Sequence, residues 1–139
     1  MRQLEIRIPA LPPKEASPNW KPKGEGIGWV GYKAIKGWRD LVYFSAISAR
    51  NEWERANMPS GWNLWEPLQK ATISVTFYVP NKRYIQDDAN ALGGLKGAID
   101  ELTMPRARKR GAEILLDDSH KVLTFLKPVW SFPGEGGKE

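Results

Sequence analysis

The chain has 139 residues and a formal net charge of +5, and its 41% hydrophobic and 27% charged residues are typical of one globular domain with a core of its own. It contains no cysteine and only one histidine, His120, which excludes disulfides, thiolate zinc sites and histidine-rich metal centres. No segment approaches the roughly 18 apolar residues of a membrane span, and the N-terminus lacks the apolar block of a signal peptide, so we expect a cytoplasmic protein without membrane partners.

The N-terminal half predicts a strand, a long loop and a helix. Apolar residues alternate over 4–8, which predicts a first strand, and the segment 14–31 is rich in Pro, Gly and Trp, which predicts a loop. A helix is predicted over 33–56 because apolar residues recur every three or four positions. Its expected buried stripe consists of Ile35, Trp38, Val42, Ala46, Ala49 and Trp53.

The C-terminal half continues the alternation. Residues 71–79 predict the clearest strand, 89–103 a second helix, 113–116 a strand or turn, and 121–127 a last strand that Pro128 ends. The second helix has the expected buried stripe Leu92, Leu95, Ile99 and Leu102. Its glycines Gly93 and Gly94 predict close backbone packing, and the alternative is the approach of a phosphate. We therefore expect a mixed α/β (α+β) fold of order strand-helix-strand-helix-strand, with a small sheet packed with helices. One domain over 1–132 and a flexible tail over 133–139 complete this prediction.

Two acidic pairs stand at element boundaries. Asp87 and Asp88 follow a strand and begin a helix, whereas Asp117 and Asp118 precede the last strand. If these strands are neighbours, we expect both pairs to meet at one end of the sheet. Crowded carboxylates repel one another, and Mg²⁺ removes that penalty and activates water for attack on phosphate. The alternatives are a helix cap for the first pair and a turn for the second.

Cationic residues accompany both pairs. Lys82 and Arg83 precede the first pair, and the connection after the second helix carries four more, namely Arg106, Arg108, Lys109 and Arg110. With the positive net charge, these residues predict contacts to nucleic-acid phosphates that do not read sequence. The alternative is a solvated basic loop. Lys96 lies one helical turn from Asp100, which predicts an ordinary ion pair or an ammonium group that stabilises charge on a reacting phosphate.

Taken in order, these features resemble the RusA-type Holliday junction resolvases. The family's core reads Asp-x-Asp-Asn, then a helix with lysine and aspartate, then an acidic pair before the last strand. This chain has Asp87-Asp88-Ala89-Asn90, then Lys96 and Asp100, then Asp117-Asp118, after a proline-rich opening, Leu11-Pro12-Pro13-Lys14, like that of phage members. The resemblance extends to about Pro128, and its specificity lies in the ordered set.

The resemblance implies a RusA-like homodimer that uses Mg²⁺, with Mn²⁺ as a substitute, to make paired nicks in a four-way DNA junction. By position it assigns Asp87, Asp118 and Lys96 to catalysis, the two aspartates also to the metal, and Asn90 and Asp100 to the motif. A junction-binding protein of the same fold with weak or no nuclease activity is the alternative.

Two positions depart from the family's pattern. The lysine is displaced, because Lys96 follows Asn90 by six residues whereas in some members it follows by three. The second motif aspartate falls on Ala89, so Asp88 or Asp117 would have to supply the missing metal ligand. The resemblance therefore implies the fold more strongly than it implies DNA cleavage.

Overall fold

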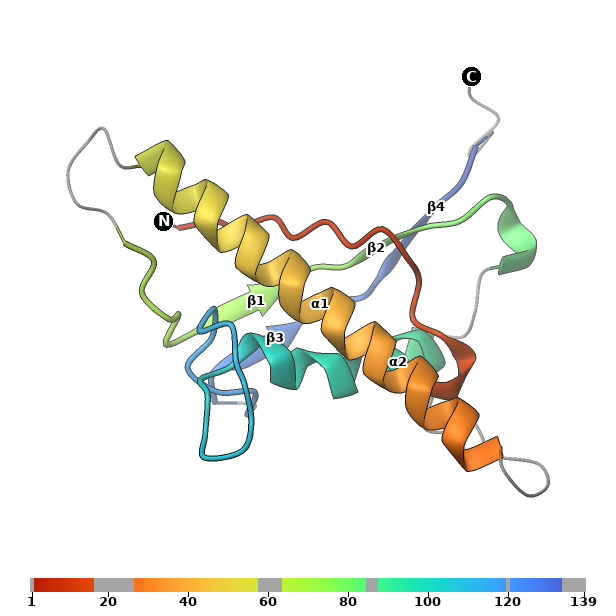
Figure 1. Ribbon diagram of the computed structural model, residues 1–139. Coiled ribbons are helices and arrows are strands. Elements are labelled where there is room, and N and C mark those ends of the chain that lie inside the picture. The colour runs from red at the N-terminus through yellow and green to blue at the C-terminus, as the bar shows by residue number, and fades with distance from the viewer. Residues whose placement is uncertain (1, 17–26, 58–63, 85–87, 120, 134–139) are drawn as a thin grey trace.

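The strands of this protein form a narrow parallel ribbon with two helices packed against it (Figure 1). The computed structural model describes residues 2–16, 27–57, 64–84, 88–119 and 121–133. In chain order the elements are η1 (Lys14–Ala16), α1 (Ile27–Asn57), β1 (Ala71–Ile73), β2 (Thr76–Tyr78), η3 (Lys82–Tyr84), α2 (Asp88–Ile99), η4 (Asp100–Leu102), β3 (Leu123–Phe125) and β4 (Val129–Ser131), where η marks a 3₁₀ helix. The mixed α/β class predicted from the sequence is confirmed.

Two short parallel sheets follow one another along the ribbon. β1 pairs with β3, and β2 pairs with β4. Ala71 pairs with Leu123 whereas Thr76 pairs with Val129, so the register shifts by one residue between the two sheets. The segment between β3 and β4 therefore contains one extra residue, which is a bulge. Pro128 lies in this bulge, where its missing N–H is tolerated. The predicted strand 121–127 is observed as β3, which ends before Pro128, but it is not the last strand because pairing resumes as β4.

The predicted strand 4–8 is also wrong as a hydrogen-bonded element. Leu4, Ile6 and Ile8 are half-buried against the core, and the residues between them are exposed. Across the part of the chain that the structure describes, no ladder pairs this segment with a strand. Alternation of apolar and polar residues indicates that one side of an extended segment is buried. An unpaired segment that packs on the core has this pattern as well as a paired strand.

The helices keep their predicted faces but change their bounds. α1 begins at Ile27, inside the predicted loop, and buries Trp38, Val42 and Ala46. α2 ends at Ile99 and tightens into η4 rather than continuing to residue 103. Gly94 is buried, and a Cβ there would lie 3.3 Å from Cβ of Pro12, so the interpretation of close packing is confirmed at this glycine.

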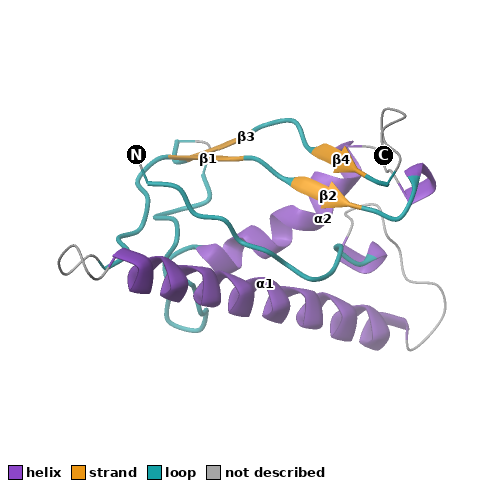
Figure 2. Cartoon of the chain, turned by 90° about the horizontal axis from the view of Figure 1, so that it is seen from above, coloured by secondary structure: helices purple, strands orange, loops and turns teal. Residues whose placement is uncertain are grey.

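The connection through α2 gives the ribbon its direction. α2 lies in the connection from strands β1 and β2 to the parallel strands β3 and β4. It therefore begins near the ends of β2 and β4 and runs back toward the start of β3 (Figure 1). Figure 2 shows the strands along one side of the molecule and α1 along the other, with α2 crossing between them in that view. The core at this interface includes Leu95, Ile99 and Leu123.

Candidate functional site

Asp88 and the second acidic pair lie at opposite ends of the parallel strands, and Asp87 lies outside the described residues. Asp88 begins α2 beyond the finish of β2, whereas Asp117 and Asp118 precede β3. The strands that border the pairs are neighbours, but they are parallel, so the finish of one is far from the start of the other. The 12-residue helix α2 between them spans about 18 Å. Asp88 and the second pair therefore do not share one end of the sheet within one chain, whereas the position of Asp87 stays a prediction.

The second acidic pair has a hydrogen bond within itself. The backbone N–H of Asp118 donates to Oδ1 of Asp117 at 2.8 Å, and Nη2 of Arg106 lies 3.9 Å from the same oxygen. Among the residues with described side chains, no three carboxylate or histidine groups lie close enough to hold one metal ion. Asp87 and the side chains of Asp88 and Asn90 lie outside the described part, so their assignment as ligands stays a prediction.

The start of α2 shares its end of the ribbon with a basic turn. Asn81 fixes this turn, since its side-chain oxygen accepts from the N–H of Arg83 at 3.0 Å and its backbone oxygen from Tyr84 at 3.1 Å. Lys82, Arg83 and Tyr84 are exposed, as is Tyr78 on β2. Helix N-termini and the carboxyl ends of parallel strands are where α/β proteins bind anions. This end of the molecule therefore suits a phosphate group.

Lys96 and Asp100 do not pair. Lys96 is exposed on α2, whereas Asp100 lies 3.5 Å from Nη2 of Arg39 and 3.6 Å from Nζ of Lys109. The interpretation of Lys96 and Asp100 as an ordinary ion pair is therefore wrong. Asp100 instead joins the C-terminal end of α2 to α1 and to the basic connection that follows η4.

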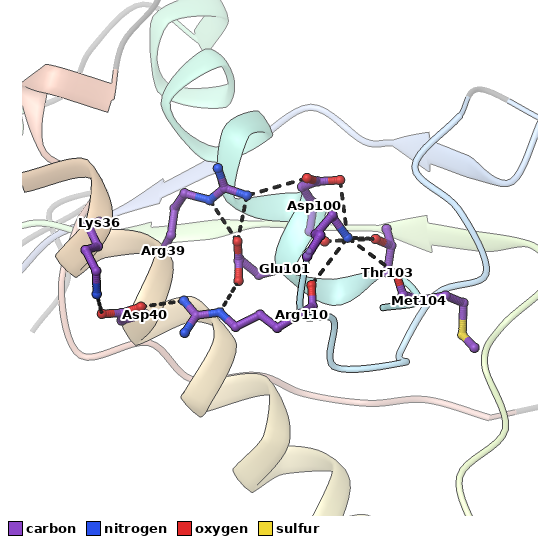
Figure 3. Close-up of polar contacts among 9 residues, drawn as sticks. Lys36, Arg39, Asp40, Asp100, Glu101, Thr103, Met104 and Arg110 are labelled. Carbon is purple, nitrogen blue, oxygen red and sulfur yellow. Dashed lines mark hydrogen bonds and ion pairs between the residues drawn. The ribbon is translucent and has the colours of Figure 1, made fainter. Parts of the chain in front are cut away.

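A paired network of charges surrounds Glu101 (Figure 3). The Glu101 side chain is only 5% exposed, and each of its oxygens is held by a different arginine. Nε of Arg39 on α1 donates to Oε2 at 2.8 Å, and Nε of Arg110 donates to Oε1 at 2.6 Å. Arg110 also donates a hydrogen bond to Asp40, and Oδ2 of Asp40 accepts a hydrogen bond from Nζ of Lys36 at 3.0 Å. We call Arg39, Asp40, Glu101 and Arg110 the Glu101 network.

The electrostatics of the network favour its charged form. The hydrogen bond from Arg110, followed by that from Lys36, holds the pKa of Asp40 below its ordinary value of 3.8. Burial alone would lower the pKa of Arg110, but its hydrogen bonds to Glu101 and Asp40 outweigh burial and raise it. The guanidinium also lies 4.5 Å from the ring centre of Tyr43. Arg110 is therefore committed to contacts within the protein.

The four cations of the predicted basic connection thus fall into two classes. Arg110 binds the Glu101 network, and Lys109 donates to Oγ1 of Thr103 at 2.8 Å. Arg106 and Arg108 are exposed to solvent. The prediction of phosphate contacts stays open for all four residues, but only Arg106 and Arg108 offer their guanidinium groups without loss of an internal partner at short distance.

Sequence reasoning missed Asp40 and Glu101. Asp40 follows Trp38 and Arg39 at the border of the apolar stripe of α1, and Glu101 stands between the stripe residues Ile99 and Leu102. A carboxylate next to the end of a buried stripe was the available signal. What the sequence did not supply was the approach of Arg110, which is 70 residues from Asp40 in the chain.

Comparisons with protein-family models, with curated proteins and with solved structures found no match to this chain. The resemblance to the RusA-type resolvases therefore rests on the motif residues named above. Within the described ranges, no helix is both long and apolar enough to cross a membrane.

Proposed function

We propose that the protein is a Mg²⁺-dependent endodeoxyribonuclease that resolves Holliday junctions or related branched DNA. The observation that carries the proposal is the shared position of the basic turn η3 and the start of α2 at Asp88, at the carboxyl ends of β2 and β4. A phosphate bound there would meet Lys82, Arg83 and the helix N-terminus. The motif order and the net charge of +5 support the same substrate.

In this proposal Asp87 and Asp118 act in cleavage, Asp88 or Asp117 replaces the carboxylate missing at Ala89, and Lys96 assists. A magnesium ion bound to these groups would supply Lewis-acid activation of the phosphate. Asp87→Asn and Asp118→Asn should each abolish Mg²⁺-dependent cleavage of a synthetic four-way junction and leave binding in EDTA intact. Glu5→Gln removes one exposed carboxylate elsewhere and serves as the control. Full activity in either aspartate variant would remove that residue from the site.

The separation of the acidic pairs makes the homodimer important to this proposal. A second copy can bring its Asp118 to the Asp87 end of the first, which one chain does not do by itself. Mixing the inactive Asp87→Asn and Asp118→Asn proteins tests this arrangement, because a shared site leaves one intact site in each mixed dimer. Recovery of nicking supports a shared site. If the mixture stays inactive while light scattering shows dimers, each site is built within one chain.

The second candidate is a junction-binding protein without nuclease activity. The observation that favours it is Ala89, which stands where the family's motif has its second aspartate. Tight binding of a four-way junction over duplex DNA, with no cleavage at any Mg²⁺ or Mn²⁺ concentration, would select this candidate.

A further inference from the structure

The residues after η4 form a small hairpin with a basic tip. The N–H of Arg106 donates to the carbonyl of Lys109 at 2.8 Å, and the N–H of Lys109 donates to that of Arg106 at 3.0 Å. The two residues make an isolated antiparallel bridge, so Ala107 and Arg108 form the exposed loop. A hairpin this short has too little pairing to hold an orientation by itself. Its position must come from contacts at its base.

The base of the hairpin is held on both sides. Nζ of Lys109 donates to Oγ1 of Thr103 at 2.8 Å and to the carbonyl of Met104 at 3.4 Å (Figure 3). Arg110, the next residue, reaches the buried Glu101 carboxylate, whose other oxygen is held by Arg39 of α1. Glu101 therefore links the hairpin to α1 through Arg39, and Asp40 of α1 is a second, direct partner of Arg110.

The tip residues differ from those at the base. Among the described residues, the Arg106 side chain has one ion pair, the contact of 3.9 Å with Asp117, between side chains that are 70% and 41% exposed. Such a contact is weak because water screens it. Arg108 makes no ion pair with any described residue, and it is exposed. The tip thus presents two guanidinium groups that a polyanion can reach without breaking the network beneath them.

We propose that Glu101 is a positioning residue that fixes the hairpin, so that Arg106 and Arg108 form a preorganised contact for DNA backbone phosphates. This inference rests on the proposed DNA-binding function. A fixed hairpin lowers the ordering cost of binding. It does not change the number of phosphates that are contacted, and the salt dependence of binding reports that number. Loss of the anchor and loss of a tip arginine therefore have different signatures.

The test compares Glu101→Gln with the matched control Glu52→Gln, which removes the same charge from an exposed position on α1. Trypsin cleaves after arginine and lysine, so an unfastened hairpin should be cut at its tip at least about tenfold faster under native conditions. Affinity for a synthetic four-way junction should fall about 5- to 10-fold at every salt concentration, with an unchanged salt slope. Glu52→Gln should change neither measurement.

Asp40→Asn extends the test if Glu101→Gln does not fold. It removes a second carboxylate partner of Arg110 from a half-buried position and should produce smaller changes in the same directions. Folded variants with wild-type tryptic rates would overturn the inference, as would faster cleavage with wild-type affinity. Faster cleavage of Glu101→Gln, combined with no junction binding by the wild-type protein, would instead overturn the proposed function and leave only the anchoring of the hairpin.

Discussion

The Glu101 network and the basic tip at Arg106 and Arg108 contain the same kinds of side chain in different surroundings. In the network, the buried carboxylate of Glu101 has an arginine on each oxygen. At the tip, the guanidinium groups face water. A charge that loses its water needs a partner, whereas an exposed charge remains available to a ligand. The comparison separates cations that hold the fold from cations that can bind DNA, although Arg110 lies within five residues of both tip arginines.

The largest expected effect comes from removing the centre of the network. Glu101→Ala should lower the free energy of unfolding by about 3 to 5 kcal/mol, because two guanidinium groups then lose their shared carboxylate in a partly buried place. Glu5→Ala breaks an ion pair whose side chains are 76% and 86% exposed, and it should cost less than about 1 kcal/mol. Urea denaturation of both variants measures the contrast. Equal losses would mean that burial does not distinguish the two pairs.

The sequence predicted the helical faces and the alternation of 71–79, because apolar spacing reports directly which residues face a core. It did not predict strand direction or pairing, since periodicity is the same in parallel and antiparallel strands. This is why the two acidic pairs were expected at one end of the sheet, whereas Asp88 and the second pair lie at opposite ends. The network was missed for a related reason: Arg39 and Arg110 meet Glu101 only after α1 and the hairpin have packed.

Separating the two backbone segments at the base of the hairpin should destabilise the protein. A Cβ on Gly111 would lie 2.1 Å from the carbonyl oxygen of Thr103, so Gly111→Ala forces the two backbones apart. We expect a loss of about 2 to 3 kcal/mol in unfolding free energy, near the upper end of overpacking effects. Gly37→Ala, where a Cβ meets nothing within 4 Å, is the control and should be neutral or slightly stabilising. A neutral Gly111→Ala would show that the hairpin base is not tightly closed.

Acid should weaken the network through Asp40. Its pKa is lowered in the folded protein by Arg110 and then by Lys36, so the stability it contributes is complete above the ordinary value of 3.8. That contribution is lost as the pH falls through the lower pKa of the folded state. The stability difference between the wild-type protein and Asp40→Asn should therefore be constant near neutral pH and shrink below 3.8. Urea midpoints of both proteins across this range measure it, and a difference that persists in strong acid would contradict the assignment.

The smallest stability effect is expected at the tip, where the functional effect should be clear. The double variant Arg106→Gln, Arg108→Gln removes exposed charges, so it should change the unfolding free energy by less than about 0.5 kcal/mol. If each guanidinium neutralises one phosphate, the slope of log affinity against log salt should become shallower by about two units. Lys121→Gln together with Lys127→Gln removes the same charge from other exposed positions and serves as the control for net charge. An equal change in slope for both pairs would mean that DNA responds to total charge, and the hairpin tip would then have no special place in the footprint.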